Sequence, residues 1–244
     1  MSATDRAGEL DSIINKQQLS TLFQVIFSLK NRKVFGYEAL TRGPPKSTLH
    51  KPLDLFRYAF SHGHLQSLDK ISCSLALSRF KRAALSEKLF INLSPHSITF
   101  FDREMENLIT LGNGAGITPE KVVIEISEQF PSENMGKLIS ELDRYRAMGV
   151  EVAIDGFGMG YSGFRQWFDI EPDYIKLDSY FVKNAQNEKN KQLFLEGIQS
   201  LTEKISCKLI VEGVETQQEF KFVCDMGVDL VQGFFIGYPQ TLVN

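Results

Sequence analysis

The sequence alternates between short apolar runs and longer stretches with helical spacing, and this alternation most restricts the fold. The first two runs, residues 21–30 and 33–42, are separated by Asn31-Arg32, which predicts an initial hairpin. Six further runs follow, at residues 89–94, 122–127, 150–155, 174–178, 208–213 and 230–234. The intervening spacing predicts helices, at 65–84, 134–148, 188–204 and 216–226. Continuous apolar strands joined by crossovers of this length predict a parallel sheet that is buried on both faces.

Two α/β architectures fit this pattern, an open doubly wound sheet and a closed barrel. Eight strand candidates without a break in the alternation favour the barrel, and the opening hairpin predicts that one strand is antiparallel. A length of 244 residues suits one such domain. We therefore predict a modified TIM (β/α)8 barrel over residues 21–240, preceded by a lead-in or helix over residues 1–20.

Composition and charge exclude several classes of protein. With 43% hydrophobic and 23% charged residues, the chain has the composition of a globular protein. A net charge of -3 provides no general attraction to duplex nucleic acid or acidic membranes. No stretch reaches the ~20 apolar residues of a membrane segment, and the polar start lacks a signal core, which predicts a cytoplasmic location. The three cysteines and four histidines lack the spacing of a disulfide frame or a zinc site.

Polar residues stand at the ends of nearly all the apolar runs. They are Glu38 with Arg42, Asn92, Glu125, Asp155, Lys176 with Asp178, Glu212 and Gln232. In a parallel barrel these ends share one face, where crowded carboxylates need a cation to compensate their charge. Oxygen donors without a nearby thiol or imidazole favour Mg²⁺ or Mn²⁺. Taken singly, each residue is more typical of a cap or an ion pair, but seven at one end of a barrel favour a metal site.

Seven ordered motifs resemble those of the EAL family of cyclic di-GMP proteins. They are GYEALTRG at 36–43, NLS at 92–94, EIS at 125–127 followed by Glu128, the Asp155-x-Phe-Gly-x-Gly-Tyr-Ser loop ending at Ser162, KLD at 176–178, EGVE at 212–215 and QGF at 232–234. The resemblance covers roughly residues 20 to 240. It implies a barrel that binds cyclic di-GMP and, in active members, opens one phosphodiester to give linear pGpG.

The resemblance also implies a role for single residues. The first Mg²⁺ or Mn²⁺ would be held by Glu38, Asn92, Glu125 and Asp155, and a second would be shared by Asp155 and Glu212. The dinucleotide would be faced by Gln24, Leu40, Arg42, Asp178 and Gln232. Lys176 would orient or deprotonate the attacking water, Glu215 would support the site, and Glu128 would anchor the loop from Gly156 to Ser162. A depressed pKa would let Lys176 accept a proton; the alternative is a structural ion pair with Asp178 or Glu212.

One departure from the family pattern divides the functional hypotheses. Hydrolysing members usually carry two successive aspartates before the Phe-Gly loop, and here the second position is Gly156. A slow phosphodiesterase and a catalytically inactive receptor both fit this loss. A third hypothesis is an unrelated barrel metalloenzyme, such as an aldolase or an enolase-like lyase, that uses Lys176 as a Schiff base or a general base. The resemblance further implies a homodimer formed around the loop after Asp155, and a longer parent chain with sensory, GGDEF or CBS modules.

Overall fold

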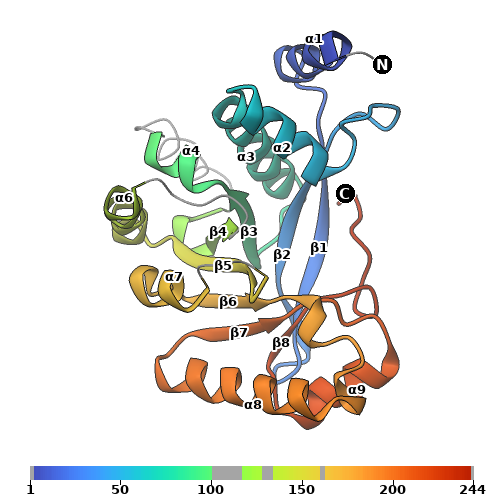
Figure 1. Cartoon of the computed structure of the whole chain (residues 1–244), viewed down its shortest axis with the longest axis vertical. Helices are drawn as coiled ribbons and strands as arrows, with labels where there is room; N and C mark the ends of the chain where they lie inside the picture. The colour runs from blue at the N-terminus through green and yellow to red at the C-terminus, as the bar shows by residue number, and fades with distance from the viewer. Residues whose placement is uncertain (1–2, 101–116, 128–133, 160–162, 243–244) are drawn as a thin grey trace.

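The fold is a closed barrel with helices on its outside, seen in a computed structural model that describes residues 3–100, 117–127, 134–159 and 163–242 (Figure 1). The strands follow the chain order around the barrel: β1 (Ser20–Ser28), β2 (Lys33–Arg42), β3 (Lys88–Leu93), β4 (Val122–Ser127), β5 (Glu151–Phe157), β6 (Tyr174–Leu177), β7 (Lys208–Val211) and β8 (Leu230–Val231). Strand β1 is antiparallel to both β2 and β8, and the other neighbours are parallel. The predicted barrel with one antiparallel strand is confirmed, and the open sheet is excluded.

Helices surround the barrel on its outside, except that α1 lies beyond α2 and α3 (Figure 1). They are α1 (Ala3–Asn15), α2 (Pro52–Ser61), α3 (Leu65–Arg82), α4 (Pro95–Phe100), α6 (Met135–Ala147), α7 (Gly163–Ile170), α8 (Lys189–Lys204) and α9 (Gln217–Asp225), with 3-10 helices η2 (Pro119–Lys121), η3 (Ser179–Phe181) and η4 (Ala185–Asn187). The four predicted helices correspond to α3, α6, α8 and α9. Helices α2, α4 and α7 lie outside the four predicted stretches. None of the helices in the described ranges is long and apolar enough to cross a membrane.

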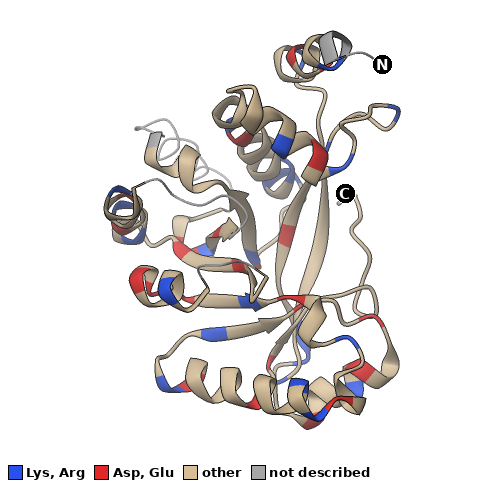
Figure 2. Ribbon diagram, in the orientation of Figure 1, with Lys and Arg blue, Asp and Glu red and all other residues tan. Residues whose placement is uncertain are grey.

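Two apolar layers hold the barrel together, and a third holds the N-terminal helix. One layer lies between the strands and the surrounding helices, with Phe80, Leu142 and Val223 as helical examples. The second fills the barrel interior, with Ile26, Phe90, Val123, Ala153, Tyr174, Ile210 and Leu230. Leu10 and Ile13 of α1 belong to a separate cluster with residues of α2 and α3. Most charged residues lie on helices and connecting segments (Figure 2), so the charged residues on strands stand out as exceptions.

Gly213, directly after β7, is a position where the fold requires glycine. Its φ is +68°, and an added Cβ would lie 2.2 Å from the Ser179 Cβ. We expect Gly213→Ala to lower the free energy of unfolding by at least ~2 kcal/mol, because the left-handed backbone and the clash both penalise a side chain. Urea denaturation measures the change.

Gly197 in α8 provides the matched control for that substitution. No atom lies within 4 Å of an added Cβ there, and its φ lies outside the left-handed region. Because alanine is the better helix former, Gly197→Ala should raise the free energy of unfolding by about 0.5–1 kcal/mol. Destabilisation of similar size by both substitutions would contradict this account of Gly213.

Candidate active site

The site residues point into the barrel because each follows a buried interior side chain by two positions. Successive side chains on a strand alternate between the two faces, so residues i and i+2 share a face. The pairs are Phe90 and Asn92, Val123 and Glu125, Ala153 and Asp155, Tyr174 and Lys176, Ile210 and Glu212, and Leu230 and Gln232. The apolar member of each pair lies deeper in the barrel and fills its interior. The polar members therefore gather at the carboxyl ends of the parallel strands.

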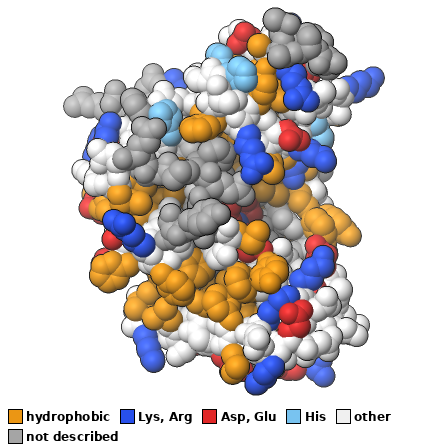
Figure 3. Space-filling view, in the orientation of Figure 1, with side chains coloured by type: hydrophobic (Ala, Val, Ile, Leu, Met, Phe, Trp, Pro, Cys, Tyr) orange, Lys and Arg blue, Asp and Glu red, His pale blue; other side chains and the backbone are white. Residues whose placement is uncertain are grey.

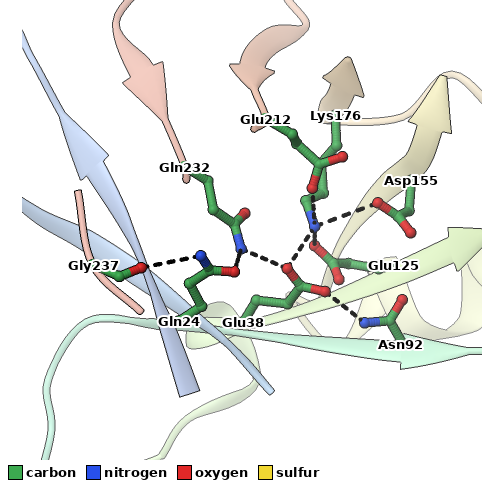
Figure 4. Close-up of polar contacts among 9 residues, drawn as sticks. All are labelled: Gln24, Glu38, Asn92, Glu125, Asp155, Lys176, Glu212, Gln232 and Gly237. Atoms are coloured by element: carbon green, nitrogen blue, oxygen red, sulfur yellow. Dashed lines mark hydrogen bonds and ion pairs between the residues drawn. The ribbon is translucent and has the colours of Figure 1, made fainter. Parts of the chain in front are cut away.

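Lys176 lies at the centre of this group, surrounded by carboxylates from four other strands or strand ends (Figure 4). Its Nζ lies 2.9 Å from oxygens of Glu38, Glu125 and Glu212, and 3.4 Å from Asp155 Oδ1. The lysine and Glu125 side chains are 0% exposed, whereas the Asp155 and Glu212 side chains keep 25% and 20% exposure. One buried ammonium thus faces four carboxylates. The ion pair with Glu212, which was the structural alternative for Lys176, is present together with three others.

Side-chain amides complete the hydrogen bonds of Glu38 (Figure 4). Asn92 Nδ2 donates to Glu38 Oε1 at 2.9 Å, and Gln232 Nε2 donates to Glu38 Oε2 at 2.6 Å. Gln232 Nε2 also contacts Gln24 Oε1 at 3.2 Å, and Gln24 Nε2 donates to the Gly237 carbonyl at 3.1 Å. Gln24, Glu38, Asn92 and Gln232 are therefore one connected polar group, joined to the backbone of the C-terminal segment.

The electrostatics of the group are unbalanced without a further cation. Burial raises the pKa of Glu125 well above its ordinary value, and the neighbouring Glu38 carboxylate adds to this. Burial also raises the pKa of Asp155, and it raises that of Glu212 to about 8, although Lys176 opposes both shifts. Burial alone would raise the pKa of Glu38, but Lys176 and the amide donors hold it below its ordinary value. Four acidic groups share one ammonium, and three of them consequently resist ionisation.

The carboxylates around Lys176 oppose the depressed pKa that we expect for this lysine beside metal ions. Burial by itself would lower the pKa, but the surrounding carboxylates, Glu125 and Glu212 foremost, raise it well above the ordinary lysine value. An ammonium in this field keeps its proton. Lys176 can donate hydrogen bonds from this position but cannot act as a base while the carboxylates surround it.

The donor chemistry of the group fits a hard divalent cation. All candidate ligands supply oxygen, and neither oxygen of Glu125 accepts a hydrogen bond although Oε1 lies within ion-pair distance of Lys176. The cost of burying the Glu125 carboxylate is therefore offset mainly by the opposite charge of Lys176, and a divalent metal ion would supply more positive charge than this ammonium. With the side chains in these positions, the described residues contain no group of three or more Asp, Glu, Cys or His side chains that could bind one metal ion together. Lys176 occupies the space between the carboxylates instead.

The other predicted site residues divide into those near the group and those apart from it. Leu40 lines a cleft of 260 Å³ together with Glu38, Asn92 and Asp155. The Arg42 guanidinium donates to the Thr41 carbonyl at 3.0 Å, and proximity to Glu38 partly opposes the lowering of its pKa by burial.

Two of the predicted residues have other surroundings, and a third cannot be placed. Asp178 accepts the Tyr180 N–H at 2.7 Å and caps η3. Glu215 is exposed before α9, and its backbone N–H donates to the buried Glu219. Glu128 lies outside the described residues, as do residues 160–162 of the glycine-rich loop. The roles assigned to these residues stay predictions.

Asp69 of α3 is a buried acid at the cleft that no sequence motif indicated. Its Oδ2 accepts the hydroxyls of Ser94 at 2.6 Å and Ser97 at 2.5 Å, and the Ser94 N–H at 3.2 Å. These bonds fix the segment that follows Asn92. Burial outweighs them and raises the pKa of Asp69 from 3.8 to about 6. A helical aspartate with polar neighbours in sequence carries no periodic signal, so only the tertiary contact identifies it.

The raised pKa of Asp69 predicts a specific pH dependence of stability. Because the folded protein holds the proton more tightly than the unfolded chain, the favourable contribution is complete below about pH 4 and is lost as pH rises through about 6. The shift corresponds to about 3 kcal/mol. Asp69→Asn removes this titration, so its free energy of unfolding relative to wild type should rise by that amount between pH 4 and pH 7. Urea titrations at both pH values test this, and a difference that does not change with pH would contradict it.

A match to a known family supports the reading of these motifs. The family model described as EAL domain matches residues 7–239, nearly the whole chain. The chain belongs to the EAL domain family. The barrel agrees with the EAL fold, since the solved EAL domain protein of Listeria monocytogenes superposes on 99% of this chain with a TM-score of 0.84, at 22% identity and over 95% of its own chain.

Two relatives illustrate the similarity of this EAL domain to known proteins. Cyclic di-GMP phosphodiesterase NbdA of Pseudomonas aeruginosa is 27% identical over 244 residues, covering 96% of this chain and 30% of NbdA. The solved complex of Klebsiella pneumoniae BlrP1 with calcium and cyclic di-GMP has a TM-score of 0.83 at 27% identity, covering 94% of this chain and 57% of that one. A manganese complex of BlrP1 has a TM-score of 0.82 at 28% identity, with coverages of 92% and 56%.

Proposed function

We propose that this EAL domain binds cyclic di-GMP and hydrolyses it to linear pGpG with the help of Mg²⁺ or Mn²⁺. The observation that carries the proposal is the ring of Glu38, Glu125, Asp155 and Glu212 around one buried position at the carboxyl ends of the strands. Relatives named cyclic di-GMP phosphodiesterases, and BlrP1 complexes that contain the dinucleotide with manganese or calcium, support it.

The described residues can divide the work of hydrolysis. Glu38, Asn92, Glu125 and Asp155 would hold a first divalent cation, and Asp155 and Glu212 a second. Bound cations would supply Lewis acidity and lower the pKa of the attacking water. Arg42 can offer its guanidinium fork to a phosphate, while Leu40 lines the cleft beside Glu38. Lys176 would orient or deprotonate the attacking water, and the carboxylates that hold its proton in the present arrangement favour the first of these roles.

The second candidate function is a receptor that binds cyclic di-GMP without turnover. Gly156 favours it, because glycine supplies no carboxylate where active relatives usually have a second aspartate. The backbone of Gly156 has φ +69°, and no atom lies within 4 Å of an added Cβ. The space for the missing side chain is thus open. Retention of the other acidic residues and Lys176 favours the enzyme.

Chromatography of the products distinguishes the two functions. The protein is incubated with cyclic di-GMP and Mn²⁺ or Mg²⁺, and pGpG is measured over time. The enzyme hypothesis expects pGpG that forms in proportion to protein and is lost with a chelator. Cyclic di-GMP binding without pGpG at high protein concentration would favour the receptor, and absence of binding would reject both.

A homodimer within a longer protein is part of the same proposal. Hydrophobic side chains gather on the face over α7 and α8 (Figure 3), where Phe164, Phe168 and Leu193 are more than half exposed. An exposed apolar face of this kind suits a symmetric contact with a second copy. The chain spans about 30% of the length of relatives such as NbdA and DosP of Escherichia coli, which leaves room for fused sensory, GGDEF or CBS modules. The predicted cytoplasmic location belongs to this proposal as well.

A further inference from the structure

We infer that Lys176 is the internal counter-ion of the metal-free site, and that divalent cations bind by displacing its ammonium from the carboxylates. The inference rests on the proposed metal-dependent function and adds a competitor for the metal, supplied by the protein itself. Lys176 thereby sets the divalent affinity of the site, apart from any part it takes in hydrolysis.

Among the described residues, Lys176 is the cation in direct ion-pair contact with the four carboxylates of the site. All four carboxylates lie within 3.4 Å of Nζ, and the lysine side chain is fully buried. Neither oxygen of Glu125 has a hydrogen-bond partner, so in the part of the chain that the structure describes the ion pair with Lys176 is what compensates its charge. Across the described ranges the acidic residues leave no ready-made position for an ion between them. The lysine ammonium takes up that position.

The same oxygens cannot fully coordinate a divalent ion and keep their contacts with Lys176. A cation shared by Glu38, Glu125 and Asp155 would lie within a few ångströms of Nζ, where two positive charges repel strongly in a buried setting. Metal entry therefore requires the ammonium to withdraw. The free energy of those ion pairs is subtracted from the free energy of metal binding, so a neutral side chain at this position should bind metal more tightly.

Calorimetric titration with Mn²⁺ alone, without nucleotide, tests this directly. Lys176→Met keeps an unbranched chain of similar length without charge, and we expect its Kd for Mn²⁺ to be about tenfold lower than that of wild type. Lys88→Met is the matched control, since Lys88 pairs with Glu151 on the strands but far from the group around Lys176. It removes the same charge, and its Kd should stay within about twofold of wild type. Equal or weaker Mn²⁺ binding by Lys176→Met would overturn the inference.

A stability measurement gives a second, independent readout. Without metal, Lys176→Met leaves four carboxylates uncompensated, so we expect EDTA to lower its melting temperature strongly and Mn²⁺ to restore it. If that variant does not fold, Lys176→Met with Glu212→Gln restores the balance of charge and is compared with Glu212→Gln alone. The double variant should fold and bind Mn²⁺ more tightly than the single one. A double variant that fails to fold with Mn²⁺ would also count against the inference, because Lys176 would then be needed for more than its charge.

The outcomes separate this inference from the proposed function. If wild type and all variants bind no Mn²⁺, the metal-dependent function itself is wrong. If wild type binds Mn²⁺ and the loss of the Lys176 charge brings no gain, only the counter-ion role is wrong.

Discussion

Glutamine in place of Glu125 is expected to lower both the Mn²⁺ affinity and the rate of pGpG formation by ~100-fold or more. Loss of residues that only support a metal ligand costs about 10–100-fold, and Glu125 is itself placed as a ligand. The Glu125 side chain is fully buried and has lost its hydration water, and no hydrogen bond to either carboxylate oxygen replaces that water. Glutamine has the same shape but one less negative charge. Calorimetry with Mn²⁺ and product chromatography measure the two effects.

The stability of the same variant should move in the opposite direction. In the metal-free protein the cost of burying this carboxylate offsets its share of the Lys176 ion pair, and Lys176 keeps three other carboxylates, so Glu125→Gln should leave the free energy of unfolding unchanged or raise it. Glu141→Gln is the control, because Glu141 pairs with Arg144 on the surface of α6. It should alter neither metal affinity nor turnover. Retained Mn²⁺ affinity in Glu125→Gln, or a loss of its fold with Mn²⁺ absent, would contradict the assignment of Glu125 as a metal ligand.

The strands could be predicted from sequence because apolar residues gather in short runs, which form consecutive buried positions in β3 to β7 and alternate with less buried positions in β1 and β2. The predicted run at 122–127 matches β4 residue for residue, and the hairpin around Asn31-Arg32 joins β1 to β2 as expected. Strand ends were less predictable. Glu212 lies beyond β7, which ends at Val211, although it remains beside its predicted neighbours. Side-chain periodicity fixes which face a residue occupies, but hydrogen bonding between strands decides where a strand stops.

The grouping of Glu38, Glu125, Asp155, Glu212 and Lys176 at the strand ends could be predicted from sequence, but its internal geometry could not. Polar residues at strand ends, together with the ordered motifs, identified the acidic group and Lys176. Lys176 is central because side chains from β6 and from several other strands all point towards the barrel axis. This arrangement cannot be read from any single segment of the sequence. Glu219 was missed for the same reason: it is buried in the capping box of α9 and accepts the Glu215 and Thr216 N–H groups. Helical spacing alone marks it as an ordinary N-terminal acid.

Gly156→Asp should raise the rate of pGpG formation by between ~10-fold and ~100-fold and lower the Mn²⁺ concentration needed for half-maximal activity. The added carboxylate would follow Asp155 directly and supply the ligand that the second cation lacks. The backbone position has room for a side chain, since nothing lies within 4 Å of an added Cβ. The φ of +69° costs little for aspartate, which together with asparagine tolerates the left-handed region better than other residues. Product chromatography over a series of Mn²⁺ concentrations measures both changes.

Gly156→Asn separates the added charge from the added side chain. Asparagine has the same size and a similar tolerance of positive φ, but it is a neutral and much weaker ligand for a divalent ion. It should therefore change the stability as aspartate does while leaving the rate near that of wild type. A gain of equal size in both variants would mean that stiffening of the backbone, and not the charge, limits turnover. No gain in either variant would mean that turnover is not limited by the missing second-cation ligand at position 156, and the receptor function would then be favoured.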